Sequence, residues 1–141
     1  YTIALDPAVD ATQVRLPAMM LQPYVENSIW HGILPMGHQG HVEIAVGPTA
    51  DAGRVMVRIA DDGIGVDESR KAKAGQENDH ISRGIEITKG RADVLRRLEL
   101  TDIRIEGPRQ RREPASQRSI GTEVTIELPV QQPVIKSAEG L

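Results

Sequence analysis

Three polar side chains, Glu26, Asn27 and His31, lie in an otherwise amphipathic segment, LQPYVENSIWHG. Asn27 and His31 are four residues apart, so in a helix they project from one face, with Glu26 one step around it. Mg2+ favours oxygen ligands and keeps several of its waters, so one side-chain oxygen together with substrate phosphates is enough to hold it. Asn27 is therefore a candidate magnesium ligand. The alternative is that Asn27 makes local hydrogen bonds and that His31 is a core or helix-end histidine.

A second candidate site lies at the end of a strand expected at residues 54–60. Asp61 follows this apolar segment in the sequence DDGIG, which also contains Gly63, Ile64 and Gly65. A carboxylate in this position can accept a hydrogen bond from an exocyclic amine such as that of adenine. The glycines leave room for a ring or a phosphate near the backbone, and they permit positive φ. An aspartate that caps a loop before an ordinary turn is the simpler alternative.

Phosphate-binding residues are expected farther along the chain. Gly84 opens a predicted helix, so its free amides and the helix dipole form a natural phosphate cradle, with Arg83 and Lys89 nearby as cations. Gly84 equally serves to let the preceding loop enter the helix. Thr122 precedes the last predicted strand, where its hydroxyl either bonds a ligand or serves the turn.

The composition favours one small domain and excludes several classes of function. The chain has 141 residues, the length of a single domain with a two-layer core. Its net charge is -3 with both signs interspersed, so no nucleic-acid surface is expected. The absence of cysteine excludes disulfides and thiolate metal sites. No apolar run has the length of a membrane span and no signal-peptide pattern is present, so no membrane contact is expected for this chain.

The start of the chain predicts a piece of a longer protein. The sequence opens within a strand pattern, YTIAL, and without a methionine. We therefore expect one folded domain at residues 1–130, followed by a flexible tail at residues 131–141.

The pattern of apolar residues predicts alternating strands and helices. Strands are expected at residues 1–5, 41–46, 54–60, 102–106 and 123–128. Helices are expected at residues 17–21, 22–32 and 84–98. Residues 66–83 have almost no apolar anchors and predict a long mobile loop, and the arginine-rich residues 109–112 predict a solvated loop. The fold class is α/β: a two-layer α/β sandwich in which helices cover one face of a mixed sheet.

The candidate sites follow one another as in the Bergerat-fold ATPases, which include DNA gyrase, a heat-shock chaperone, histidine kinases and the MutL proteins. Residues 16–32, LPAMMLQPYVENSIWHG, resemble the PxxLQPxVENAxxHG signature of LytS-like sensor histidine kinases. The resemblance runs from Tyr1 to about Pro129. It implies the Bergerat fold, with ATP and Mg2+ as cofactors.

The resemblance also assigns roles to the candidate residues. Asn27 would bind Mg2+, and Glu26 would hold metal-bound water or orient the acceptor. Asp61 would bind adenine, with Thr122 on the adenine side. Residues 66–83 would form the ATP lid. The remaining nucleotide contacts would come from His31, Gly63, Ile64, Gly65, Arg83, Gly84 and Lys89.

The function implied is that of the catalytic ATP-binding domain of a two-component sensor histidine kinase. It would transfer the γ-phosphoryl group to a histidine on an upstream dimerisation domain, and a response regulator would act downstream. The domain would be cytoplasmic, in a membrane-bound sensor. Trp30 stands where the family usually has Lys or Arg, and Glu86 stands in the second glycine box. These departures would allow the first alternative, a nucleotide-binding or protein-interaction module with reduced or lost catalysis. The second alternative is an anti-sigma-type Ser kinase.

Overall fold

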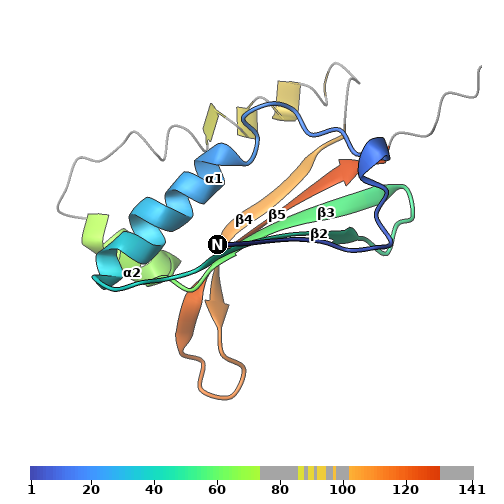
Figure 1. The fold of residues 1–141 in the computed structure, drawn as a ribbon. Helices are drawn as coiled ribbons and strands as arrows, with labels where there is room; N and C mark the ends of the chain where they lie inside the picture. Colours follow the sequence, from blue (N-terminus) through green and yellow to red (C-terminus); the bar gives the residue numbers. More distant parts are fainter. Residues whose placement is uncertain (74–85, 88, 91, 95–96, 98–101, 131–141) are drawn as a thin grey trace, which may run out of the picture.

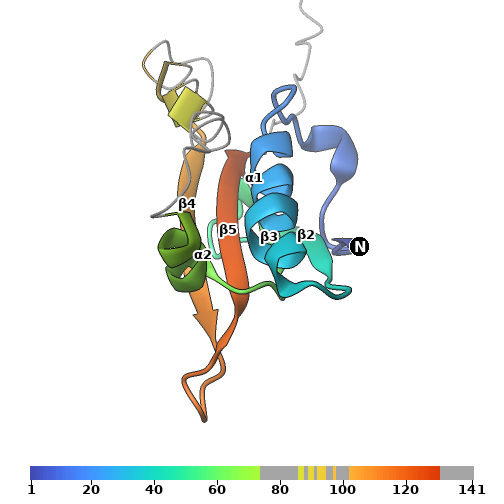
Figure 2. The same ribbon diagram turned by 90° about the vertical axis from the view of Figure 1, so that its left-hand side faces the viewer.

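The computed structural model describes residues 1–73, 86–87, 89–90, 92–94, 97 and 102–130. One five-stranded sheet organises these residues, in the order β1-β2-β3-β5-β4. The strands are β1 (Thr2–Leu5), β2 (Val42–Pro48), β3 (Arg54–Asp61), β4 (Arg104–Arg112) and β5 (Ser119–Pro129). β1 pairs in parallel with β2, and the other neighbours are antiparallel. Helices α1 (Gln22–Asn27) and α2 (Val66–Lys73) lie on one face of the sheet (Figures 1 and 2). The predicted two-layer α/β fold with a mixed sheet is confirmed.

The N-terminal helix starts at the expected residue and ends later than expected. Pro23 lies in its first turn, where a missing backbone N–H costs nothing. The helix does not stop at Gly32: it continues through a π-helical turn, Ser28–Ile33, and a 3₁₀ turn, Leu34–Met36, and ends at Gly37 with φ 71°. The prediction of a separate helical turn at residues 17–21 was wrong, because Met19 has φ 63° and the segment forms only a turn.

A stripe of buried residues at every fourth position turns this helix toward the sheet. Met20, Tyr24, Ser28 and Gly32 are all buried, as expected for one face of a helix. Met20 and Tyr24 pack with the apolar side chains of β3 and β5, among them Ile59, Ile126 and Leu128. The side chains of the stripe become smaller toward Gly32, which lets the helix approach the end of β3 closely.

The predicted loop over residues 66–83 was wrong in its first part, because residues 66–73 form α2. Asp67 and Glu68 lie in its first turn, where they complement the helix dipole. Lys71 pairs with Glu68 at 2.7 Å, one turn away. Good helix formers and favourable charges thus form a helix without apolar anchors. Residues 74–83 lie outside the described residues.

The two C-terminal strands are longer than predicted. Residues 109–112 were expected in a solvated loop, but they belong to β4, which pairs with β5 as far as Arg112 and Ser119. The hairpin that joins these strands projects beyond the rest of the sheet (Figure 1). Arg109 pairs with Glu123 of β5 at 2.8 Å, so cross-strand charges support the pairing.

The other elements agree with the sequence. The opening strand and the hairpin of β2 and β3 form as predicted. The described residues within the helix predicted at residues 84–98 are helical, and Ala92 is buried there. The predicted tail, residues 131–141, lies outside the described residues. Among the described residues no helix is long and apolar enough to cross a membrane.

Candidate functional site

Asp61 lies at the end of β3 and is almost completely buried, with 1% of its surface exposed. Its Oδ1 accepts hydrogen bonds from the backbone amides of Gly63 at 3.0 Å and Thr122 at 3.1 Å. Its Oδ2 is buried and has no hydrogen-bond partner among the described residues. The carboxylate is therefore held in place through one oxygen, while the other is left for a donor that is not part of this structure.

The electrostatic setting of Asp61 combines burial with several stabilising neighbours. Burial raises the pKa of Asp61 above its ordinary value. The Ser28 side chain, the amides of Gly63 and Thr122 and the charge of Arg111 act in the opposite direction. A buried acceptor without a donor is costly, and a ligand that brings an N–H group to Oδ2 removes that cost.

Close contacts between backbone segments shape the surroundings of this carboxylate. A Cβ on Gly32 would lie 3.0 Å from Asp61 Oδ1, and a Cβ on Gly63 would overlap the backbone of Gly32. Gly121 has φ 112°, and a Cβ there would overlap the carbonyl oxygen of Asp61. Glycine is therefore required where the helix, the turn after β3 and the start of β5 meet. The Ile64 amide donates to the Gly32 carbonyl at 3.0 Å and joins the first two of these segments.

The structure places Asn27 and His31 beside the two helical residues that contact Asp61. Asn27 is half-buried and precedes Ser28, and His31 is half-buried and precedes Gly32. His31 lies in the π-helical turn, a distortion that is frequent at functional sites. Glu26 accepts a hydrogen bond from Gln22 Nε2 at 2.7 Å. Asn27 and His31 are thus next in sequence to the helical residues that face Asp61, and the roles expected for Glu26, Asn27 and His31 stay predictions.

The other predicted site residues differ in whether they lie near Asp61. Thr122 is buried, and its amide bonds Asp61. Gly65 follows in the same turn, with φ 86°. Lys89 donates to the Gly107 carbonyl at 2.9 Å, and it borders a pocket of about 340 Å³ against the start of β4. No contact in the described part of the chain joins Lys89 to Asp61. Arg83 and Gly84 lie outside the described residues.

Sequence reasoning missed several residues of this site. Ser28 and Gly32 follow Tyr24 at intervals of four, and this spacing places them on the same helical face as Tyr24. Arg111 donates to the Asp61 carbonyl at 2.8 Å, although it belongs to a segment that was expected to be solvated. No local pattern identifies that contact, since the two residues are 50 positions apart.

The polar groups around Asp61 fit a nucleotide better than a metal ion held by protein side chains alone. The described residues contain no group of three or more His, Cys, Asp or Glu that could hold a metal ion. A magnesium ion at Asn27 would therefore depend on substrate phosphates and water for most of its ligands. The unpartnered Oδ2 of Asp61 fits the amine of a purine.

Comparisons with known proteins identify the family of this chain. Residues 12–132 match the family described as histidine kinase-, DNA gyrase B-, and HSP90-like ATPase. Sensor histidine kinase YpdA of Escherichia coli (strain K12) is 34% identical over 116 residues, which cover 74% of this chain and 20% of that protein. The chain therefore spans about a fifth of the length of this curated relative.

A solved structure shows the same fold. The histidine kinase domain of a blue-light activated histidine kinase from Erythrobacter litoralis superposes with a TM-score of 0.51 at 15% identity. The match covers 92% of this chain and 50% of that one.

Proposed function

Because the chain belongs to the family of histidine kinase-, DNA gyrase B- and HSP90-like ATPases, we propose that it is the catalytic ATP-binding domain of a LytS-like sensor histidine kinase. The family and the histidine kinase relatives support an ATP-binding kinase domain. The LytS-like assignment rests on the signature at residues 16–32.

One observation carries the proposal: the half-satisfied carboxylate of Asp61. The amides of Gly63 and Thr122 fix Oδ1, and the buried Oδ2 has no partner among the described residues. The exocyclic amine of adenine supplies a donor of the required kind, whereas guanine presents a carbonyl at the equivalent ring position. The site therefore favours ATP over GTP.

The proposed roles of the other residues rest on the family resemblance of the sequence. Asn27 binds Mg2+, and Glu26 orients metal-bound water or the acceptor. Thr122 contacts the adenine side of the nucleotide. The remaining contacts come from His31, Gly63, Ile64 and Gly65 near Asp61, and from Arg83, Gly84 and Lys89 as phosphate-binding residues. ATP supplies the phosphoryl group, and the protein contributes position and charge neutralisation.

We further propose that the acceptor is a histidine on a dimerisation domain of the same protein, and that a response regulator receives the signal. The identity with a sensor histidine kinase supports this assignment. The parent would be a membrane-bound sensor, with this domain in the cytoplasm.

A nucleotide-binding module with reduced catalysis is the second candidate. Trp30 is 57% exposed in the π-helical turn, where related kinases usually carry a cation. An indole cannot neutralise phosphate charge, so this position favours binding over turnover. Phosphoryl transfer to a separately supplied dimerisation domain distinguishes the two candidates: a labelled acceptor histidine supports the kinase, and ATP binding without a labelled acceptor supports the module.

Asp61→Asn tests the nucleotide assignment, with Asp62→Asn as the matched control. Asparagine keeps an oxygen for the two backbone amides but loses the charged acceptor, a change worth about 1.5–3 kcal/mol, or roughly 10- to 150-fold in affinity. Isothermal titration calorimetry should show this loss for ATP and a much smaller one for GTP. Asp62 is exposed and bonds the His41 amide, so its variant should bind ATP like the parent. An unchanged ATP affinity in Asp61→Asn would remove the basis of the proposal.

A further inference from the structure

The hairpin of β4 and β5 holds the segment that follows Asp61. Gln110 of β4 lies at the centre of this contact and is half-buried. Its Oε1 accepts from the Asp67 amide at 3.1 Å, and its Nε2 donates to the Gly121 carbonyl at 3.4 Å. The same nitrogen contacts the hydroxyl of Ser119. Ser119 in turn donates to the Ile64 carbonyl at 3.1 Å, so the hairpin binds the segment at residues 64 and 67.

Two arginines of β4 extend this contact to both ends of the segment. Arg111 donates to the Asp61 carbonyl at 2.8 Å. Arg112 pairs with the Asp67 carboxylate at 2.7 Å. The side chains of Arg112 and Asp67 are 45% and 50% exposed, so this ion pair is screened by solvent and contributes little. The half-buried hydrogen bonds of Gln110 and Ser119 are therefore the stronger part of the contact.

The segment passes so close to Gln110 that only glycine fits at residue 65. Gly65 has φ 86°, and a Cβ there would overlap the side-chain amide of Gln110 and lie 2.5 Å from the Ser119 hydroxyl. The backbone between Asp61 and Asp67 is thus fitted to the hairpin on one side, while its other side adjoins Gly32 through the Ile64 amide.

We propose that Gln110 is a positioning residue for the nucleotide base. This inference rests on the proposed function, in which Asp61, Gly63, Ile64 and Gly65 surround adenine. Gln110 holds the backbone of this segment in its binding geometry before the ligand arrives. Without that support, the segment must become ordered when the ligand binds. The entropy lost in that ordering makes binding less favourable, so affinity falls.

Gln110→Ala tests the inference, with adenosine and ATP as the probes. We expect the affinity for both ligands to fall by a similar factor of about ten, with and without Mg2+, because Gln110 supports the base end of the site. Gln110→Glu keeps the acceptor for the Asp67 amide and should restore part of the affinity. A merely structural role would lower the unfolding midpoint and leave the affinity unchanged well below it.

Two serines of the hairpin provide a milder matched pair. Ser119→Ala removes the hydrogen bond to Ile64 and should weaken adenosine binding in the same direction as Gln110→Ala. Ser116→Ala removes contacts that stay within the tip of the hairpin, to Glu113 and to the Arg118 amide, and should bind like the parent. Ser119→Ala keeps the test valid if Gln110→Ala fails to fold.

Hydrogen exchange at the Asp67 amide separates this inference from the proposed function. Exchange should be faster in Gln110→Ala than in the parent or in Ser116→Ala, with no nucleotide present. If exchange accelerates but adenosine and ATP bind as before, the contact exists without positioning the base and the inference is overturned. If the parent binds neither ligand, the proposed function fails and the inference falls with it.

Discussion

Asp61 and Tyr24 each have a buried polar atom without a partner in the described part of the chain, for different reasons. Asp61 Oδ2 and the Tyr24 hydroxyl are both buried and without a hydrogen-bond partner among the described residues. Asp61 lies where the helix, the turn after β3 and the start of β5 meet closely at glycines. Tyr24 lies in the apolar core with Met20 and Ile59. The first atom is available to a ligand, and the second is an imperfection of packing.

The role proposed for Asn27 predicts a loss that depends on metal. Asn27→Ala should weaken binding of Mg-ATP and leave Mg-free ATP and adenosine nearly unchanged, because the residue is assigned to the metal and not to the base. Titration calorimetry with and without Mg2+ measures the difference. Ile29→Ala, at a partly exposed position of the same helix, serves as the control for helix stability. An equal loss with and without Mg2+ would assign Asn27 a structural role.

Tyr24→Phe should leave the domain as stable as the parent, or raise its unfolding free energy by up to about 1 kcal/mol. The substitution removes a buried hydroxyl without a partner and keeps the ring, so packing is preserved. Urea denaturation measures the change. Tyr1→Phe is the control, because Tyr1 is 92% exposed. A loss of more than about 1 kcal/mol would reveal a hydrogen bond that the hydroxyl makes in solution.

Alkaline pH gives the same pair of variants a second readout. Burial raises the pKa of Tyr24 from 10.0 to about 12. The folded-state pKa lies above the unfolded value, so this contribution to stability is fully present below pH 10 and is lost as the pH rises toward 12. The unfolding free energy of the parent should therefore decline over this range more steeply than that of Tyr24→Phe.

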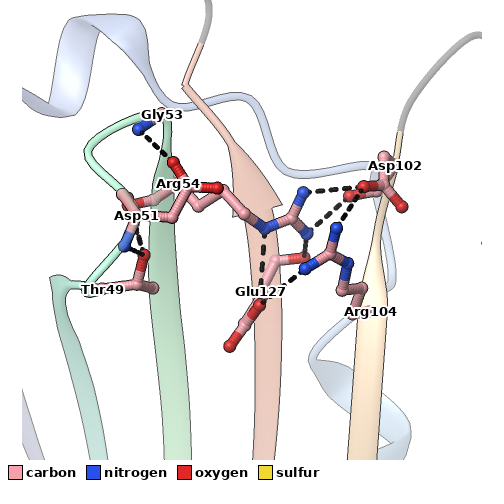
Figure 3. Close-up of polar contacts among 7 residues, drawn as sticks. All are labelled: Thr49, Asp51, Gly53, Arg54, Asp102, Arg104 and Glu127. Carbon is pink, nitrogen blue, oxygen red and sulfur yellow. Dashed lines mark hydrogen bonds and ion pairs between the residues drawn. The ribbon is translucent and has the colours of Figure 1, made fainter.

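At the scale of elements, a buried arginine of β3 joins β5 and the residues just before β4, at the end of the sheet opposite Asp61. Arg54 is 6% exposed and contacts Asp102 at 2.8 Å and Glu127 at 3.4 Å (Figure 3). It also donates to the backbone carbonyls of Asp102 at 2.8 Å and Glu127 at 3.2 Å. The turn before it is fixed by Thr49 and Asp51, whose side chains bond the turn backbone.

Arg54→Met should lower the unfolding free energy by about 2–3 kcal/mol. The change leaves two backbone carbonyls without this donor and leaves the two carboxylates with Arg104 as their partner. This remaining contact and the partial exposure of Asp102 and Glu127 keep the loss below that of a fully buried pair. Arg104→Met is the matched control: Arg104 contacts the same two carboxylates but is 56% exposed, so its loss should stay below about 1 kcal/mol. Chemical denaturation of both variants makes the comparison, and equal losses would contradict the ranking by burial.

Periodicity predicted the elements that have one apolar face, and it failed where contacts between distant residues decide the structure. β2 and β3 alternate apolar and polar residues, and they form where expected. The second half of β4 is rich in arginine and has no such pattern; cross-strand pairing with β5 and contacts to Asp61 and Asp67 place it. Asp61 and Thr122 were identified as separate candidates, but the hydrogen bond that joins them spans 61 positions and has no local signal.

At the scale of the whole molecule, the proposed binding site and the ion pairs of Arg54 lie at opposite ends of β3. Asp61 and Arg54 are the two ends of this strand, so they lie about 23 Å apart at about 3.3 Å per residue. Substitutions at such a distance usually contribute additively to the free energy of unfolding. The ion pairs around Arg54 should therefore govern stability without changing nucleotide affinity.

Ligand-linked stabilisation tests this separation. At 100 times its dissociation constant, Mg-ATP should raise the unfolding free energy of the parent by about 2.7 kcal/mol, since only the folded domain binds it. Arg54→Met, although less stable, should gain the same increment at the same ligand concentration, because its site at Asp61 is unchanged. Asp61→Asn should gain much less from ATP while keeping most of its stability without ligand. Chemical denaturation at matched ATP concentrations measures all three, and a smaller ATP increment in Arg54→Met would show that the two ends of β3 are coupled.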